Sequence, residues 1–301
     1  MRILIFGAGS LGCGVGGLLA KVHEVVLVGR KGNMDAVRAN GLRLSGEVEA
    51  TVKAEAYEAA AGLAQPDLVV LTTKAYDTRS AVDALSALPW PDTPVITLQN
   101  GLGNLEMLRA WKGAKAFGGT TTMGAALLSP GNVRLSGLGR TVVGADMDEP
   151  GASRIAEAFS ACGLRTEVSR DIAGEIWAKA VVNSCINPLT AVLRVPNGRL
   201  LSSPAVSRLM SELCLECSAV AAAAGVVLPE GRMIDRVRAV AKDTAENRSS
   251  MLMDVEHRRR TEIAQMNGAM CRVGSFHGVP TPLNRAMTAM VEALEPAREK
   301  G

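Results

Sequence analysis

The sequence is short of aromatic residues, of net charge and of long apolar runs, and each shortage excludes a class of protein. Aromatic residues make up only 3% of the chain, so it offers no stacking surface for single-stranded nucleic acid. A formal net charge of +3 is too small for the electrostatic footprint of a nucleic-acid binder. No stretch approaches about 18 uninterrupted apolar residues, the length that indicates a membrane span. We therefore expect neither nucleic acid nor a membrane as a partner.

Metal ligands and covalent nucleophiles are also scarce. The three histidines show no metal-ligand spacing, and neither a GxSxG elbow nor a P-loop lysine is present. The six cysteines are scattered, and Cys214 and Cys217 form a CxxC within a helical pattern that lacks a second pair. This favours reduced, partly buried thiols in a cytoplasmic protein over a zinc or redox site. The opening "MRILIFGAG" enters a strand directly and predicts no signal peptide.

The first part of the chain alternates strand and helix signals, and "GRKGN" (29–33) indicates a loop between them. Alternating strands and helices predict an α/β domain of the Rossmann type with a parallel sheet. The predicted strands are 2–6, 24–28, 68–72, 94–98, 115–118, 141–144 and 164–168, and the predicted helices are 10–21, 77–87, 103–111 and 151–161.

Strand signals fade after about residue 171, and long segments rich in Ala, Leu, Met, Glu and Arg follow. We predict a Rossmann-type domain at 1–168 and an all-α domain at 169–301. Because ligands often bind where domains meet, we expect the ligand site in a cleft between the two. The predicted helices are 171–187, 202–224, 230–241, 244–274 and 282–299.

A GxGxxG motif directly follows the first predicted strand and opens a helix. Its glycines permit a tight turn, a close approach of backbone to pyrophosphate and close packing of helix on strand. The helix N-terminus supplies free N–H groups and a positive dipole end for the phosphates. In this position the motif predicts a dinucleotide site formed by Gly7, Ala8, Gly9, Ser10, Leu11 and Gly12.

The end of the second strand indicates which dinucleotide binds. The strand ends Val28-Gly29-Arg30-Lys31, without the acid that would bind the ribose hydroxyls of NAD. Arg30 suits a 2′-phosphate and favours NADP, unless the two cations only decorate a surface loop. Lys74 and Asn100 each follow a strand, where ligands of open α/β sheets bind, which modestly favours a role near the nicotinamide.

Polar residues interrupt an otherwise apolar helix in "WAKAVVNSCINPLTA" (177–191). Lys179, Asn183 and Asn187 are spaced by four and share one helix face, among core-like residues. Burial would lower the pKa of the lysine towards neutrality and make it a usable acid or base. From spacing alone, a lysine that reaches solvent beside asparagines that cap or bridge helices fits equally well. Asn187 precedes Pro188, so we expect the helix to end or kink there and the Asn187 amide to be exposed.

A second polar stripe occurs in "AENRSSMLMDVEHRRRTEIAQMNG" (245–268). Its members recur every three or four residues, which predicts one helix face with methionines and isoleucine packed beside it. Glu262 could accept a hydrogen bond from a ribose or substrate hydroxyl, or pair with Lys179. A charged, solvated face is the alternative, especially for "HRRR" (257–260). The stripe consists of Asn247, Ser250, Asp254, Arg258 and Glu262.

Nearly end to end, the chain resembles the ketopantoate reductase (2-dehydropantoate 2-reductase) family. The lysine–asparagine segment with the later "SSM" and "TEI" carries more of this resemblance than the glycine motif. The matching stretches are "GAGSLG" (7–12), Arg30, "TTKAYD" (72–77), "QNGLGN" (99–104), "GTTTMGA" (119–125), "WAKAVVNSCINPLTA" (177–191), "PNG" (196–198), "AENRSSML" (245–252) and "TEIAQMNG" (261–268).

The resemblance implies reduction of ketopantoate by NADPH, a step of pantothenate and coenzyme A biosynthesis, by a monomer or homodimer. It implies Lys179 as the general acid, and Lys74, Asn100 and Glu262 as residues on the cofactor side. Met123-Gly124 departs from the His-Ala pair of some relatives, so contacts of the cofactor-facing loop at Gly124 are an open point. The implied substrate-binding residues are Asn183, Asn187, Asn197, Asn247 and Ser250.

Two alternatives share part of this pattern. A related NADP-dependent dehydrogenase of another 2-oxo or 3-hydroxy acid would also carry a helical lysine with an asparagine four residues on. Asn187, Ser250 and "TEI" favour ketopantoate as the 2-oxo acid. A non-catalytic NADP sensor is expected to lack the lysine, which is present here as Lys179.

Overall fold

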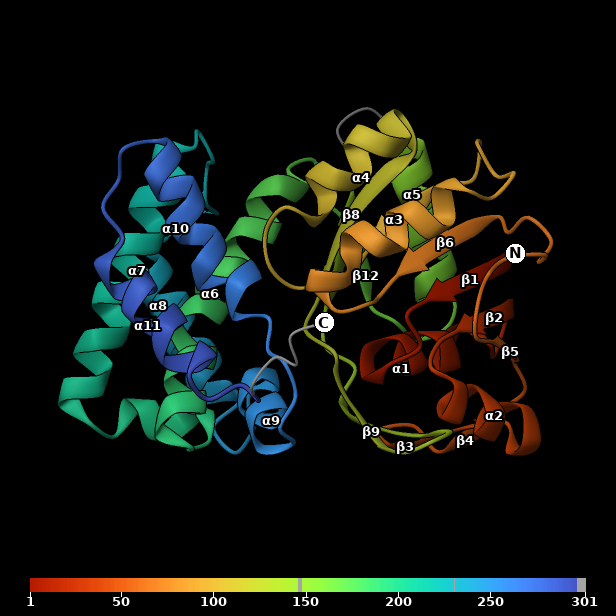
Figure 1. Cartoon of the computed structure of the whole chain (residues 1–301), viewed down its shortest axis with the longest axis horizontal. Helices are drawn as coiled ribbons and strands as arrows, with labels where there is room; N and C mark the ends of the chain where they lie inside the picture. Colours follow the sequence, from red (N-terminus) through yellow and green to blue (C-terminus); the bar gives the residue numbers. More distant parts are fainter. Residues whose placement is uncertain (146–147, 230, 297–301) are drawn as a thin grey trace. The chain divides into compact units, whose positions relative to one another are not determined.

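The computed structural model of the protein describes residues 1–145, 148–229 and 231–296 and contains two compact units (Figure 1). The first unit comprises Met1–Gln99 and Asn104–Ile172. The second comprises Asn100–Gly103 and Ala173–Gly301, so a short loop from the first half of the chain belongs to the second unit.

An eight-stranded sheet forms the centre of the first unit, in the order β12-β11-β8-β7-β6-β1-β2-β5. Neighbouring strands are parallel except for the antiparallel pair β8 and β11. Every predicted strand is present, and β5 adds an edge that the sequence does not predict. The bounds are β1 Arg2–Phe6, β2 Glu24–Val28, β5 Glu55–Tyr57, β6 Leu68–Leu71, β7 Val95–Thr97, β8 Ala116–Thr121, β11 Thr141–Gly144 and β12 Thr166–Val168.

Helices cover both faces of this sheet (Figure 1). Successive residues of a strand point to opposite faces, so Ile3 and Ile5 pack with α1 and α5 while Leu4 packs with α3 and α4. Near-continuous apolar strands such as "RILIF" therefore fit a sheet that is buried on both sides. The four predicted helices correspond to α1 Ser10–Leu19, α3 Thr78–Ser86, α4 Asn104–Lys112 and α5 Glu149–Ser160.

Helix α2 (Lys31–Asn40) lies where "GRKGN" indicates a loop, so that prediction is wrong. Arg30 keeps an extended backbone, and the helix begins at the next residue. A Lys31–Asp35 ion pair of 3.0 Å, four residues apart, supports its first turn, and Met34 and Val37 are buried in the core.

A second, four-stranded sheet in the order β4-β3-β10-β9 also lies outside the prediction. Its strands are β3 Leu42–Gly46, β4 Ala50–Val52, β9 Gly124–Ser129 and β10 Asn132–Gly137. Strand β10 pairs with β3 in parallel, although the two are far apart in the chain. Only this non-local pairing brings Leu44, Val133 and Leu135 into the core beside α1.

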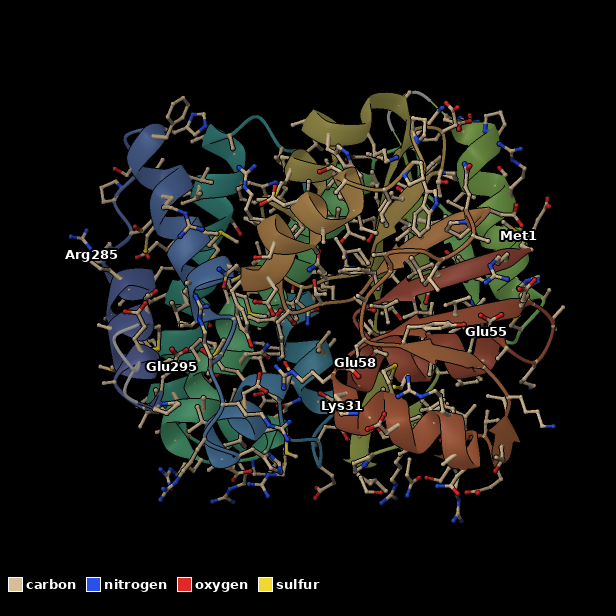
Figure 2. The ribbon with its side chains drawn as sticks, turned by 45° about the vertical axis from the view of Figure 1, so that its right-hand side comes forward. Met1, Lys31, Glu55, Glu58, Arg285 and Glu295 are labelled. Atoms are coloured by element: carbon tan, nitrogen blue, oxygen red, sulfur yellow. The ribbon has the colours of Figure 1, made fainter. Side chains whose placement is uncertain are left out.

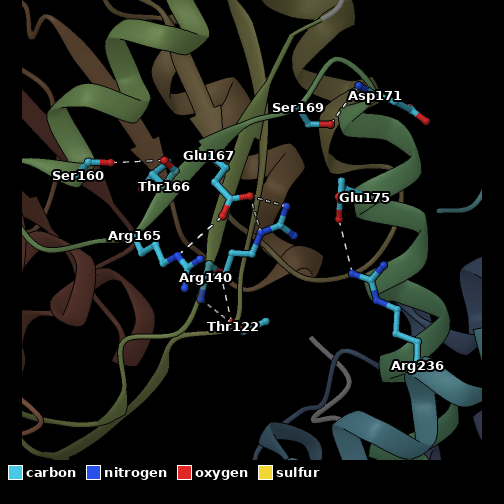
Figure 3. Close-up of polar contacts among 10 residues, drawn as sticks. All are labelled: Thr122, Arg140, Ser160, Arg165, Thr166, Glu167, Ser169, Asp171, Glu175 and Arg236. Carbon is cyan, nitrogen blue, oxygen red and sulfur yellow. Dashed lines mark hydrogen bonds and ion pairs between the residues drawn. The ribbon is translucent and has the colours of Figure 1, made fainter. Parts of the chain in front are cut away.

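The second unit is helical. Its helices are α6 Ile172–Leu193, α7 Pro204–Ala223, α8 Met233–Asp243, α9 Ser250–Glu256, α10 Asn267–Phe276 and α11 Pro282–Glu292. The first residue of α6, Ile172, belongs to the first unit. The start of the predicted helix 230–241 and the end of 282–299 fall on residues outside the described ones. An ion pair between Glu175 and Arg236, 3.6 Å apart, links α6 to α8 within the second unit (Figure 3). In the first unit, Arg140 pairs with Glu167 of β12 at 2.8 Å.

The predicted helix 244–274 is wrong, because the chain breaks between α9 and α10. Arg258 has a φ of 51°, in the left-handed region that ends a helix, and residues after it are irregular until the 3-10 helix Ile263–Gln265. Asn247 precedes α9, so Asn247, Ser250, Asp254, Arg258 and Glu262 do not share one helix face.

The sequence predicts that helix α6 ends or kinks at Pro188; the helix runs five residues past the proline, so an end at this point is wrong. Tertiary packing overrides the break, because Leu189 and Ala191 on the far side of the proline are buried in the core. By length and apolar composition α6 is the one described helix that would also pass as a membrane span, but 72% of its apolar window is buried inside the protein. That burial is what a core helix shows.

Candidate active site

The glycine turn of the first unit is held tightly by backbone contacts. Gly7 and Ala8 donate N–H bonds of 2.9 and 2.8 Å to the Val28 carbonyl at the end of β2. Gly7 has a φ of 111°, and a Cβ there would lie 2.4 Å from the Thr73 nitrogen. A Cβ on Gly12 would lie 2.3 Å from the Gly7 carbonyl oxygen. Glycine is therefore required at both positions, for conformation and for close packing.

Gly9 differs, since a Cβ built there meets nothing within 4 Å. It is the N-cap of α1, where the first-turn amides have no acceptors within the helix. Because glycine has no side chain, Gly9 does not cap these amides itself. A helix N-terminus with open space in front of it suits a pyrophosphate. The Ser10 hydroxyl instead accepts the Leu127 amide of β9, at 3.1 Å, and Leu11 packs against the core.

The two cations after β2 differ in what they contact. Lys31 pairs with Asp35 at 3.0 Å and with Glu58 at 3.8 Å, and Figure 2 shows Lys31 and Glu58 facing one another. Arg30 is exposed, and its side chain contacts no polar partner in the part of the chain that the structure describes. Its guanidinium, at the N-cap of α2, is thus available to an anionic ligand.

Gln99 is a buried residue at the ends of β6 and β7 that the sequence analysis did not single out. Its Nε2 donates to the Thr73 carbonyl and to the Thr78 hydroxyl, each at 2.9 Å, and its Oε1 accepts from Thr97. These bonds fix the segment that carries the half-buried Lys74, the N-cap of a 3-10 helix. A glutamine directly before Asn100 in an apolar strand is the signal that would have indicated it.

Met123 and Gly124 serve packing in this chain. Met123 is 8% exposed and belongs to the core beside α1, and β9 begins at Gly124. A Cβ on Gly124 would lie 2.2 Å from the Ser136 hydroxyl of the paired strand β10. An alanine in place of Gly124 would therefore clash with β10, so the close packing of β9 on β10 explains the glycine at this position.

In the second unit, Lys179 stands half-buried on α6 among buried Trp177, Val181 and Val182. Burial lowers the pKa of Lys179 from 10.5 to about 8, and the negative charge of Glu262 partly opposes this shift. No hydrogen bond to the Lys179 ammonium is found among the described residues. An ammonium whose pKa is close to neutrality can exchange a proton at physiological pH.

Asn183 and Asn187 follow Lys179 at successive turns of α6. Asn183 is half-buried and has no polar partner within the described ranges. Asn187 is buried rather than exposed, and among the described residues the acceptor of its side-chain amide is the Met266 thioether, a weak acceptor, at 3.8 Å. Both amides therefore keep hydrogen-bonding capacity for a ligand.

The loop before α9 is tied to the 3-10 helix that contains Asn197. The backbone N–H of Asn197 donates to the Asn247 carbonyl at 3.0 Å. The side-chain Nδ2 of Asn197 donates to the Thr244 hydroxyl at 2.8 Å. The buried Oδ1 of Asn197 has no partner among the described residues. Asn247 and Ser250 are both exposed, so their side chains are accessible to a small molecule.

Ser249, next to Ser250, is a residue that the sequence analysis missed. It is buried, caps α9 by accepting the Leu252 amide at 3.1 Å, and accepts the Thr190 hydroxyl of α6 at 2.7 Å. A serine directly before a helix is the usual signal of such a cap.

Glu262 is 5% exposed and lies in the segment between α9 and α10. The preceding Thr261 is held by Glu295, which accepts its amide at 2.9 Å and its hydroxyl at 2.6 Å. The Asn100–Gly103 loop reaches the same segment, because Leu102 donates to the Gln265 carbonyl at 3.0 Å. Asn100 and Glu262 are thus brought to one region of the second unit.

These features define a class: an oxidoreductase with a dinucleotide-type glycine turn on a Rossmann-type sheet and a helical unit that carries a lysine of lowered pKa. Within the described residues no group of three or more His, Cys, Asp or Glu side chains could hold a metal ion, and all six cysteines are free thiols.

The chain belongs to the ketopantoate reductase family. Residues 3–147 match the family described as "Ketopantoate reductase PanE/ApbA", and residues 171–295 match its C-terminal counterpart. It is 37% identical to 2-dehydropantoate 2-reductase of Pyrococcus horikoshii and 38% identical to that of Archaeoglobus fulgidus, over 98% of each chain.

Solved structures share the whole architecture. A PanE/ApbA family ketopantoate reductase from Ralstonia eutropha is 33% identical with a TM-score of 0.91, and 98% of each chain is covered. D-mandelate dehydrogenase, in a ternary structure with NADH and anilino(oxo)acetate, is 28% identical with the same TM-score and coverage. The predicted fold class, a Rossmann-type unit followed by an all-α unit, is confirmed.

Proposed function

We propose that the protein reduces 2-dehydropantoate (ketopantoate) to pantoate with NADPH, and that Lys179 is the general acid. The observation that carries the proposal is the face of α6, where an ammonium with a pKa of about 8 stands beside two amides without strong partners. The family membership of the chain supports the same reaction. We also propose that the protein acts in the cytoplasm, where a reducing environment keeps cysteines such as these six as free thiols.

The first unit fits the cofactor. Gly7 and Gly12 permit the tight turn, and Gly9 leaves open space at the N-terminus of α1 for the pyrophosphate. Arg30 offers its guanidinium to the 2′-phosphate, and Lys74 is assigned to the nicotinamide side. NADPH, when bound, supplies the hydride that reduces the C2 ketone. NADH in the D-mandelate dehydrogenase structures shows that the fold also accepts the cofactor without that phosphate.

Lys179 completes the reduction from the second unit. As C2 receives the hydride, negative charge develops on the carbonyl oxygen, and the Lys179 Nζ gives a proton to it. The ammonium interacts more strongly with this growing alkoxide than with the neutral ketone, so it lowers the barrier rather than only binding the substrate.

The asparagines and Ser250 orient the substrate. Asn183 and Asn187 offer amides to the carboxylate and hydroxyl of the 2-oxo acid, and Asn197 offers its unpartnered Oδ1 to a hydroxyl. Asn247 in the loop before α9 and Ser250 at the first position of α9 offer exposed polar groups to the same ligand. The negative charge of Glu262 favours the protonated form of Lys179, and Asn100 lies on the loop that reaches the segment carrying Glu262.

The test is NADPH oxidation measured with 2-dehydropantoate and with a panel of simple 2-oxo acids. We expect Lys179→Ala to lower kcat by about 10²–10⁴-fold while NADPH still binds. Lys112→Ala is the matched control, because burial also lowers the pKa of Lys112 while its ammonium is bound to the Trp90 carbonyl, and its loss should leave kcat unchanged. Near-wild-type kcat in Lys179→Ala would refute the role of the lysine.

A reductase of another 2-oxo acid is the second candidate, because D-mandelate dehydrogenase shares the full fold at 28% identity. The same panel distinguishes the two. Equal kcat/KM for 2-dehydropantoate and for a phenyl-substituted or unbranched 2-oxo acid would contradict the narrower assignment.

A further inference from the structure

Helix α6 has a gap in its hydrogen bonding at the point where the proposed substrate residues lie. Pro188 has no N–H, so the carbonyl of Ser184, four residues earlier, lacks its normal helical donor, and the proline ring crowds that carbonyl. Ser184 is fully buried, and water cannot replace the missing donor. An unsatisfied buried carbonyl is costly, so a proline here calls for a substitute.

A side chain from outside α6 fills this gap. The Nδ2 of Asn267, at the start of α10, donates to the Ser184 carbonyl at 3.0 Å. Asn267 is fully buried, and its own Oδ1 has no partner among the described residues. The hydrogen bonds of the Asn267 side chain are thus made by its donor group, Nδ2, and not by its acceptor.

The direction of this amide is dictated by its neighbours. The second Nδ2 hydrogen of Asn267 goes to Asn284 Oδ1 at 2.9 Å, and Asn284 Nδ2 donates to Glu216 at 2.8 Å. Glu216 also accepts the backbone amides of Leu283 and Asn284, at 3.0 and 2.8 Å. A carboxylate only accepts, so Asn284 must present its oxygen to Asn267, and Asn267 must present its nitrogen to α6.

We infer that Asn267 is a positioning residue, whose amide replaces the hydrogen bond that Pro188 removes and so sets the geometry of Asn183 and Asn187 on α6. The gap lies between these two residues, because Ser184 follows Asn183 and Pro188 follows Asn187. Without the Asn267 donor, the Ser184 carbonyl in this turn loses the side-chain hydrogen bond that stands in for the proline N–H. The inference rests on the proposed function for its kinetic readout.

The test compares Asn267→Ala in two backgrounds, the natural chain and Pro188→Ala, in which residue 188 regains an N–H. In the natural chain we expect Asn267→Ala to lower kcat/KM for 2-dehydropantoate by about 10–100-fold, the scale of a misplaced substrate contact, with NADPH affinity unchanged. In the Pro188→Ala background the same substitution should cost less than about threefold, because the helix then satisfies Ser184 itself. Equal losses in both backgrounds would overturn the inference, and so would no loss in the natural chain.

Asn284→Ala is the matched control, since it removes the other partner of Asn267, while the Ser184 carbonyl, which can only accept, still holds the Asn267 Nδ2 towards α6. Its effect should be the same in both backgrounds. If Asn267→Ala alone is insoluble, recovery of soluble protein by adding Pro188→Ala supports the inference, and insolubility of both refutes it. If the natural chain does not reduce 2-dehydropantoate, the proposed function fails, while the melting temperatures of the four proteins still report the coupling between Asn267 and Pro188.

Discussion

The proposed role of Lys179 as a general acid depends on the pKa that its surroundings in the second unit give it. Trp177, Val181 and Val182 surround Lys179 with apolar surface, which disfavours its charged form and lowers its pKa to about 8. The negative charge of Glu262 acts in the opposite direction. The balance leaves the ammonium protonated at neutral pH, yet acidic enough to give up its proton.

This balance predicts the pH dependence of the reaction. Because only protonated Lys179 can act as the acid, kcat/KM should fall as the pH rises through about 8. Glu262→Gln removes the charge that raises the pKa, so the falling limb should move to lower pH. The measurement is kcat/KM for 2-dehydropantoate from about pH 6 to pH 10. A limb that stays in place, or moves upward, would contradict the coupling between the two side chains.

The glycines of the turn make a prediction that separates binding from stability. Gly9 has a φ of −89° and open space at its Cβ position, so Gly9→Ala should leave the melting temperature unchanged. The added methyl should nevertheless block the pyrophosphate and raise the Kd for NADPH about tenfold or more. Fluorescence titration with NADPH checks this.

Gly12→Ala is the comparison for that variant, because its Cβ would lie 2.3 Å from the Gly7 carbonyl oxygen. It should lower stability as well as affinity. A Gly9→Ala protein that binds NADPH normally would show that the pyrophosphate lies elsewhere.

At the scale of elements, helix α9 depends on a cap that also contacts α6. Ser249→Ala removes the acceptor of the Leu252 amide and of the Thr190 hydroxyl, and should lower the free energy of unfolding by about 1–2 kcal/mol. Because Ser249 joins the loop that carries Asn247 to the first turn of α9, which carries Ser250, the KM for 2-dehydropantoate should also rise. Thermal unfolding and steady-state kinetics measure the two effects.

Ser203, which caps α7 through the Val206 amide, offers the matched control. Ser203→Ala should cost stability of a similar or smaller size and leave the KM unchanged. Equal changes in KM for both variants would mean that loss of a cap acts through general loosening and not through the loop.

Local sequence predicted most of the elements, and it failed where a distant segment decided the outcome. The strands of the main sheet are short apolar runs bounded by turns, and each except the edge strand β5 was predicted. Helix α6 continues past Pro188, and Asn267 from the start of α10 donates to the Ser184 carbonyl, a contact that the local pattern cannot show. The apparent stripe from Asn247 to Glu262 has helical spacing, yet α9 ends at Glu256, Arg258 has a φ of 51°, and the members lie on different segments.

For the whole molecule, cofactor binding should be visible as stabilisation. NADPH at about 100 times its Kd should raise the free energy of unfolding by about 2.7 kcal/mol, because it binds only the folded chain. NADH at the same concentration should stabilise less, since it lacks the phosphate that Arg30 would bind. In Arg30→Ala, NADPH and NADH should raise the melting temperature by the same amount. Equal stabilisation of the natural chain by both cofactors would contradict a preference for NADPH.

The sequence by itself determined the residues whose roles depend on local spacing. The glycine turn at 7–12 needs only a strand, a turn and a helix in succession, and Lys179, Asn183 and Asn187 need only the four-residue spacing of one helix. The absence of an acid after β2 likewise indicated NADP without any tertiary information.

Tertiary structure decided what depends on contacts between distant segments. It brought the charge of Glu262 to Lys179, gave the Ser184 carbonyl its donor from Asn267, and paired β3 with β10 in a second sheet. Each of these joins residues far apart in the chain, where the free energy comes from burial and hydrogen-bond satisfaction and not from local propensity. The pKa of Lys179 belongs to this group, because it is set by the side chains that exclude water around it.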